Sequence, residues 1–151
     1  MKGRAGFLVL ALLLTVGCAT ALPRAEEVKD VSIELVDLKP EKASLAGFEW
    51  DAHLRVTNPN PFDLHIDFLE VGLEVGKGNL GTGSAKDFTV KKYDTKEVKL
   101  RIHTSSFGIA SAVLDMVQSK NFAYGLSADV TYKTQEGPHP RHLENRGSFR
   151  R

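Results

Sequence analysis

The sequence predicts an all-β protein, an antiparallel β-sandwich of the fibronectin and immunoglobulin type with about seven strands and one α-helix. Two observations predict this class. Apolar side chains recur at every second position through most of the chain after residue 28, as in strands with one buried and one solvated face. One later segment changes to helical spacing. A chain of 151 residues is long enough for one such domain with a hydrophobic core.

The clearest predicted strand runs from Phe48 to Val56, where every second side chain is apolar and the others are polar. An earlier strand, 31–38, changes phase near Val36, which indicates a bulge or a strand end. The segment 64–75 also changes phase once. Further alternating segments lie at 88–90, 98–102 and 122–132.

The predicted helix covers about residues 106–119. Its apolar side chains recur three and four residues apart, so they share one face. Ser105 or Ser106 can cap its start, and Lys120 lies near its end. We expect this helix to pack against an end or an edge of the sheets. The side chains of the apolar face are Phe107, Ala110, Val113, Leu114 and Val117.

The first residues have the order of a secretory signal peptide. Lys2 and Arg4 provide a basic start, residues 7–14 form an apolar run, and small residues precede Cys18. The run is shorter than the roughly 20 residues that a transmembrane helix needs. The expected division of the chain is a lipoprotein signal peptide at 1–17, a tether at 18–27 and a single domain at 28–151.

The segment around Cys18 resembles a bacterial lipobox. Gly17 is the small residue before the cysteine, whereas Thr15 holds the position usual for leucine, with Leu14 one step further out. The resemblance implies that Cys18 becomes an acylated N-terminus carrying palmitate or similar chains. Because Ala19 follows instead of aspartate, it also implies an outer-membrane location facing the periplasm. The alternative is an ordinary cleaved signal peptide that contains a cysteine.

The most specific motif inside the domain is Asn58-Pro59-Asn60-Pro61. Each proline fixes its own φ and restricts the preceding asparagine to extended geometry, so the segment is stiff. It redirects the chain between two strands, and asparagine side chains can bond the nearby backbone. We interpret it as a structural corner; the alternative is a recognition loop.

A glycine-rich segment follows the corner. Gly76, Gly78 and Gly81 match the G-x-G-x-x-G pattern of dinucleotide-binding proteins. That fingerprint requires a helix after the glycines. Here the segment leads instead to strand-like residues 87–90. The pattern therefore predicts a glycine-rich hairpin and no bound cofactor.

Together, the two motifs resemble the WHy domain (water stress and hypersensitive response) of the group-two late-embryogenesis-abundant (LEA) family. The matching residues are Asn58–Pro61 and a later turn that contains Gly81 and Gly83. Over about residues 28–133 the resemblance implies a fibronectin-like sandwich with one helix, and an association with desiccation and stress tolerance. The family closes with an apolar strand, whereas residues 134–151 are mostly polar. We expect that end to be an exposed edge or weakly ordered.

The sequence contains no G-x-S-x-G, H-E-x-x-H or P-loop pattern. His53, His65 and His103 lie on predicted outward faces. A weak metal site would require neighbouring strands to bring His53 and His65 together, and we interpret these histidines as part of a solvated polar surface. His139 and His142 belong to the basic end of the chain, interpreted as solvated. We expect no catalytic residue and no metal site.

These features predict a non-enzymatic, lipid-anchored envelope protein that acts under desiccation or stress by binding or protection. The alternatives are a structural or assembly lipoprotein of an envelope complex, or a lipid-binding module with a pocket between the sheets. A hydrolase would need a convergent acid, base and nucleophile, which the sequence does not offer. A net charge of +1 gives no field that favours nucleic acid. We expect a monomer that contacts the membrane through Cys18 and binds an unknown protein or lipid partner.

Overall fold

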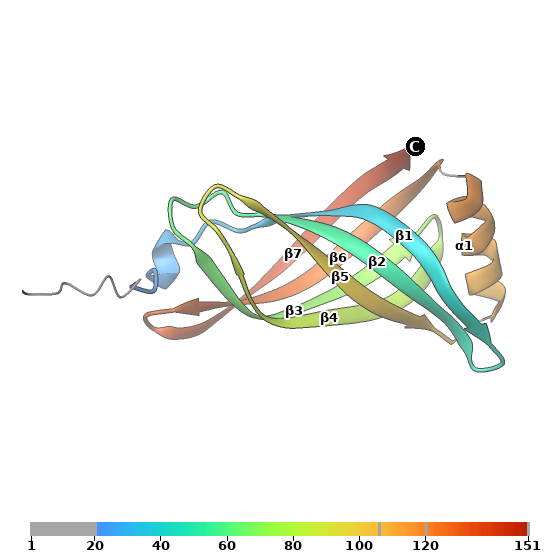
Figure 1. Ribbon diagram of the computed structural model, residues 1–151, viewed down its shortest axis with the longest axis horizontal. Helices are drawn as coiled ribbons and strands as arrows, with labels where there is room; N and C mark the ends of the chain where they lie inside the picture. The colour runs from blue at the N-terminus through green and yellow to red at the C-terminus, as the bar shows by residue number, and fades with distance from the viewer. Residues whose placement is uncertain (1–20, 106, 120, 151) are drawn as a thin grey trace, which may run out of the picture.

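A computed structural model of the protein describes residues 21–105, 107–119 and 121–150. Within these residues the chain forms seven strands, one α-helix and one short 3-10 helix (Figure 1). The helices are η1 (Ala25–Glu27) and α1 (Phe107–Ser119). The strands are β1 (Ser32–Ser44), β2 (Gly47–Thr57), β3 (Leu64–Val75), β4 (Gly78–Val90), β5 (Thr95–Thr104), β6 (Asn121–Thr134) and β7 (Gly137–Arg150).

The strands form two antiparallel sheets that pack face to face. One sheet has the order β1-β2-β5, and the other has the order β4-β3-β6-β7. The all-β sandwich predicted from the alternating pattern is confirmed, and α1 is the helix predicted near residues 106–119. Each sheet has two edge strands. On one side of the sandwich the edge strands β4 and β5 pack closely against each other, whereas on the other side the edge strands β1 and β7 make few contacts.

The sandwich is elongated, and its turns gather at two opposite ends (Figure 1). The N-terminal end, on the left, carries η1, the β2–β3 corner (58–63), the β4–β5 loop (91–94) and the β6–β7 turn (135–136). The helical end, on the right, carries α1, the β1–β2 turn (45–46) and the β3–β4 turn (76–77). Strands that run the length of the molecule therefore separate two groups of loops.

The inward-facing side chains of both sheets fill one continuous apolar core, as the alternation in the sequence requires. Trp50 in β2 and Tyr132 in β6 are fully buried, and each satisfies its polar atom inside the fold. Trp50 Nε1 donates to Thr104 Oγ1 (3.1 Å), and the Val31 N–H donates to the Tyr132 hydroxyl (3.1 Å). Burial raises the pKa of Tyr132 to about 12, so this hydroxyl stays protonated near neutral pH.

Side chains of the four-stranded sheet bind the free backbone edge of β1. Besides the bond to Tyr132, the Leu35 N–H donates to the Tyr124 hydroxyl (3.4 Å), and Asn145 Nδ2 donates to the Ile33 carbonyl (2.7 Å). These bonds join the sheets where no strand pairing does so. Because they use backbone groups that would otherwise be available, they also reduce the tendency of β1 to pair with another chain.

Helix α1 closes the helical end of the sandwich and packs on the β3–β4 hairpin. Ala110 and Val113 are buried, and a Cβ added to Gly78 would lie 3.0 Å from the Val113 side chain. Gly76, in the turn, has φ +59°, which glycine adopts without strain. The predicted glycine-rich hairpin is confirmed, because the segment leads into β4 and not into a helix.

The end of the chain differs from the weakly ordered segment expected at 134–151. β7 pairs with β6 along its whole length, and its inward side chains are half-buried. Leu143 and Phe149 pack against the core, and Phe149 stacks on Phe122 with ring centroids 5.0 Å apart. Backbone pairing with β6 stabilises this strand although its side chains are mostly polar. Prolines and charged side chains along β7 are typical of an exposed edge, which was the other expectation for this segment.

Candidate functional site at the N-terminal end

The chain enters the domain at the N-terminal end, where it is bound to the β6–β7 turn. Gln135 donates its Nε2 to the Leu22 carbonyl (2.6 Å) and its backbone N–H to the Pro23 carbonyl (3.0 Å). The Ala25 N–H donates to the Glu136 carboxylate (2.9 Å). The expected tether therefore belongs to the domain from Leu22 onward.

Cys18, the predicted acylation site, lies outside the described residues. Three residues separate it from Leu22 in the sequence, and four peptide steps span at most about 14 Å. Any group attached to Cys18 is consequently confined near this end of the sandwich. Within residues 21–105, 107–119 and 121–150, no helix is long and apolar enough to cross a bilayer.

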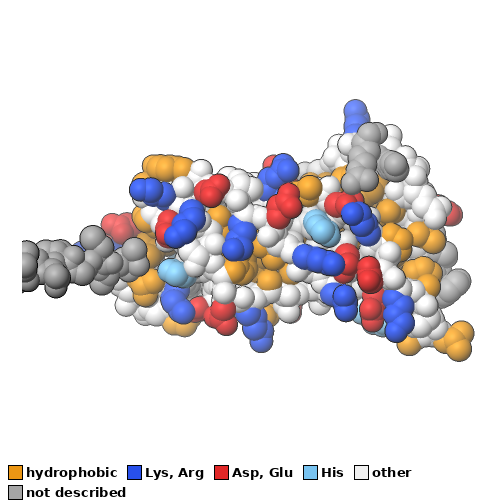
Figure 2. Space-filling model, in the orientation of Figure 1, with side chains coloured by type: hydrophobic (Ala, Val, Ile, Leu, Met, Phe, Trp, Pro, Cys, Tyr) orange, Lys and Arg blue, Asp and Glu red, His pale blue; other side chains and the backbone are white. Residues whose placement is uncertain are grey.

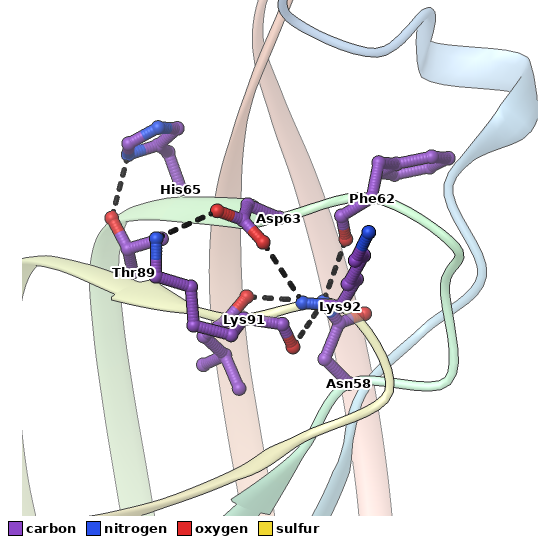
Figure 3. A network of polar contacts seen from close by, with 8 residues as sticks. Asn58, Phe62, Asp63, His65, Thr89, Lys91 and Lys92 are labelled. Carbon is purple, nitrogen blue, oxygen red and sulfur yellow. Dashed lines mark hydrogen bonds and ion pairs between the residues drawn. The ribbon is translucent and has the colours of Figure 1, made fainter. Parts of the chain in front are cut away.

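Asn58 is fully buried and joins the β2–β3 corner to the β4–β5 loop (Figure 3). Its Nδ2 donates to the carbonyls of Phe62 (2.9 Å), Val90 (3.0 Å) and Lys91 (3.1 Å). Because an amide nitrogen carries two protons, the three carbonyls share them. The Asn58 backbone N–H donates to the Asp94 carbonyl (2.9 Å). One residue thus holds the corner and both ends of the loop in place.

Asn60, also fully buried, connects the corner to the entering chain. Its Oδ1 accepts the Lys29 N–H, and its Nδ2 donates to the Lys29 carbonyl, each at 2.8 Å. Its backbone N–H and its Nδ2 both donate to Asn58 Oδ1 at 2.9 Å. These bonds are internal to the fold. This use of the side chains fits the interpretation of Asn58-Pro59-Asn60-Pro61 as a structural corner.

Asp63 fixes the start of the β4–β5 loop from the outside (Figure 3). Its carboxylate accepts a hydrogen bond from Lys91 Nζ (2.8 Å) and one from the Lys92 backbone N–H (2.9 Å). These two bonds, with that of Lys91 the larger cause, lower the pKa of Asp63, and Asp63 in turn raises the pKa of Lys91. Nearby, His65 Nδ1 and the Thr89 hydroxyl lie 2.8 Å apart.

Tyr93, at the tip of the same loop, is a residue that the sequence did not single out. Its φ is +52°, a left-handed conformation that large side chains rarely adopt, and 71% of its surface is exposed. The Tyr93 N–H donates to the Asn60 carbonyl (3.2 Å), so the corner holds it in this conformation. In a sequence, glycine or asparagine normally indicates a turn position with positive φ, and this position holds neither residue.

An open groove of about 320 Å³ lies between the entering chain and the corner. Leu22 lines one side, and Pro61 and Lys92 line the other. The start of the described chain, the corner and the loop tip therefore form one continuous surface.

The family glycines lie elsewhere, where β4 approaches β5. A Cβ on Gly81, which has φ +113°, would lie 2.7 Å from the His103 carbonyl oxygen. A Cβ on Gly83 would lie 2.9 Å from the Arg101 carbonyl oxygen. Both distances are too short for a real side chain. Gly81 and Gly83 thus allow the two sheets to approach closely, and they contribute no polar group to the corner.

The exposed large apolar side chains of the described residues lie only at the two ends of the sandwich. Tyr93 lies at the N-terminal end, whereas Leu45, Ile109 and Met116 lie at the helical end. In the view of Figure 2, charges of both signs lie along the sheets, and hydrophobic side chains reach the surface at the helical end. Leu45, in the β1–β2 turn, is fully exposed, so its contacts within the fold do not explain its apolar character.

The histidines are distributed over the surface. His53 lies on β2 and His65 on β3, in different sheets, so the structure does not bring them together as a pair. In the part of the chain that is described, no group of three or more histidine, cysteine or acidic side chains could hold a metal ion. His142 on β7 lies 2.7 Å from Asp129, whose hydrogen bond raises the histidine pKa.

The fold and this end together define a small β-sandwich domain closed at one end by a helix and at the other by an asparagine-proline corner. The family model described as "Late embryogenesis abundant protein" matches residues 53–147, which is more than half of the chain. The chain therefore belongs to this family, which is generally non-enzymatic.

The likeness to one solved structure supports the same fold. The chain is similar to a protein from Arabidopsis thaliana determined in solution, with a TM-score of 0.56, 17% identity, and coverage of 91% of this chain and 89% of that one. It is also similar to a protein determined in solution and described as a LEA protein (TM-score 0.48, 14% identity, 82% and 72% coverage). A protein from Archaeoglobus fulgidus has a TM-score of 0.47 and 13% identity, with 80% and 98% coverage. No curated protein matches the sequence.

Proposed function

We propose that the protein is a lipid-anchored envelope protein in which the LEA-type sandwich acts by binding and protection. Acylated Cys18 is the anchor, and the helical end is the surface that binds other molecules. The membership of the LEA family supports a role in desiccation or stress tolerance.

The observation that carries the proposal is the position of the entering chain. Leu22 and Pro23 are bound at the N-terminal end, a few residues after Cys18. An anchor on Cys18 holds that end at the membrane surface and directs the long axis of the sandwich outward. The fourteen residues of β6 span up to about 45 Å, so the helical end lies far from the anchoring bilayer.

The helical end suits an apolar protein segment better than lipid. Leu45 is fully exposed there, Ile109 and Met116 are about one-third exposed, and the flexible methionine adapts to irregular apolar surfaces. Lipid of the anchoring membrane is out of reach at that distance. We therefore propose that the occupant is an apolar segment exposed by a partly unfolded protein.

The anchor is tested by fractionation of cells that express the full chain. Cys18→Ser should move the protein from the membrane to the soluble fraction, because several acyl chains are lost at once. Recovery of the variant in the membrane fraction at the wild-type level would reject the anchor.

The binding surface is tested by protection of a drying-sensitive enzyme. Leu45→Ser should reduce the activity recovered after drying and leave the melting temperature within a few degrees, because this side chain is fully exposed. The control is Lys42→Ser, an exposed polar change on β1. Equal protection by all three proteins would contradict a binding role of the helical end.

A second candidate function is favoured by a cavity of about 420 Å³ on the open side between β1 and β7. Ile33, Leu126 and Leu143 give it an apolar side that could hold an acyl chain, and Glu34, Glu144 and Asn145 line the rest. Mass spectrometry of the protein purified from envelopes distinguishes the two functions. A lipid retained in one-to-one ratio, and lost in Leu143→Asp, would favour this candidate.

A further inference from the structure

We propose that the β4–β5 loop is a membrane-contact site in which the ring of Tyr93 enters the headgroup layer of the bilayer that holds Cys18. This inference rests on the lipid anchor of the proposed function and specifies how the anchored domain sits. Its ligand is the lipid surface itself, recognised by an amphipathic ring and by the flanking Lys92.

The first step is the conformation of Tyr93. A bulky side chain with φ +52° is held in a backbone region that it disfavours, and its ring is mostly exposed. Strained residues that the surrounding structure holds in place are characteristic of functional sites. Asn60 provides that hold through its carbonyl, which joins the loop tip to the corner.

The second step is distance. The loop tip belongs to the same end as Leu22, and the groove shared by Leu22 and Lys92 places the loop beside the entering chain. At most about 14 Å of chain separates Leu22 from Cys18. The headgroup layer is roughly 5 to 7 Å thick on each side of the hydrocarbon core. An acylated Cys18 therefore keeps Leu22 within about 14 Å of its own position, close enough for the loop beside it to reach the headgroups.

The third step is chemistry. Tyrosine is enriched at membrane interfaces because its ring is apolar and its hydroxyl remains hydrated. The adjacent Lys92 extends an ammonium group that suits lipid phosphates, whereas the ammonium group of Lys91 is already paired with Asp63. Acidic side chains such as Asp94 and Glu136 occur at the same end, so its charge is mixed. Contact is therefore carried by the ring of Tyr93 more than by net attraction to anionic lipid.

The test uses the full, acylated chain purified from bacteria and reconstituted in vesicles of phosphatidylethanolamine and phosphatidylglycerol. Tyr93→Trp places a fluorophore at the loop tip, and Leu45→Trp places one at the opposite end as a matched exposed control. Trp50 is buried in the core and gives the same background in both. Brominated lipids should quench the Tyr93→Trp emission and shift it to shorter wavelength, whereas the Leu45→Trp emission should stay unchanged.

The possible outcomes separate the two proposals. If the protein floats with the vesicles but the two variants are quenched equally or not at all, the membrane-contact site is wrong and the anchor stands. If the wild-type chain does not float with vesicles, the proposed lipid anchor is wrong, and the membrane-contact site that depends on it is wrong as well. Tyr93→Asn is the second variant: it should float as the wild type does, yet trypsin should cleave at Lys91 and Lys92 faster on vesicles. Unchanged cleavage would also overturn the site.

Discussion

Replacing Asn58 by alanine should remove the hydrogen bonds that join the β2–β3 corner to the β4–β5 loop at the N-terminal end. The side chain makes five hydrogen bonds, three as donor to carbonyls and two as acceptor from Asn60. Alanine leaves the Val90 carbonyl and the Asn60 N–H without these partners in a buried setting. Each such group costs about 1 to 3 kcal/mol. Allowing for water at the partly buried carbonyls, we expect a loss of about 3 to 5 kcal/mol.

That loss is large against the total stability of a domain, which is usually about 5 to 15 kcal/mol. It corresponds to a decrease in melting temperature of roughly 10 to 15 °C. Urea and thermal unfolding followed by circular dichroism measure it. Asn79→Ala is the matched control, because that asparagine makes one exposed turn bond, to the Gly81 N–H (2.9 Å). It should cost less than about 1 kcal/mol.

A loss below about 1 kcal/mol for Asn58→Ala would refute the role of this residue as a junction. Unchanged melting together with lost protection of a client enzyme would instead show that the corner is a recognition loop. That was the alternative left open by the sequence.

Three further changes probe the site and the sheets. Gly83→Ala should lower stability by about 1 to 3 kcal/mol, because the added Cβ would lie 2.9 Å from a β5 carbonyl oxygen. Gly125→Ala is the control, because its Cβ would meet nothing nearer than 3.6 Å, and it should change stability by less than about 1 kcal/mol. Equal melting temperatures of the two variants would contradict the close approach of β4 and β5. Tyr93→Asn should raise stability by up to about 1 kcal/mol in urea unfolding, because asparagine tolerates positive φ. A clear decrease in stability would show instead that the tyrosine ring supports the fold. Asp63→Asn should lower stability near neutral pH. Because Lys91 lowers the folded-state pKa of Asp63, the stability that the Asp63 carboxylate contributes is present above its unfolded pKa near 3.9 and disappears as pH falls through the folded pKa. A difference in stability between the wild type and Asp63→Asn that persists in strong acid would exclude this cause.

The strands and the corner were predictable because each depends on local rules. The alternation from Phe48 to Val56 predicts a strand with one buried face, and β2 is that strand. The two Asn-Pro pairs predict a stiff corner, since proline restricts itself and its predecessor. The spacing of apolar residues near 106–119 likewise predicts α1.

The polar end of the chain was less predictable because its order comes from a partner. β7 has few large apolar side chains, and its stability derives from backbone pairing with β6. The spacing of apolar residues in a sequence indicates which side chains are buried, but it does not indicate which strands pair with each other. The entering segment is similar: Leu22 and Pro23 are ordered by Gln135, more than a hundred residues away in the sequence.

The sequence by itself determined most of the extended segments before β7, the main turns between them and that a single sandwich results, because these features follow from the spacing of side chains along a few neighbouring residues. Tertiary structure alone decided which loops meet. It placed Lys29, Asn60 and Tyr93 in one junction beside the entering chain, and it placed Leu45 at the same end as Met116. These residues are distant in sequence, and only the pairing of strands in three dimensions makes them neighbours.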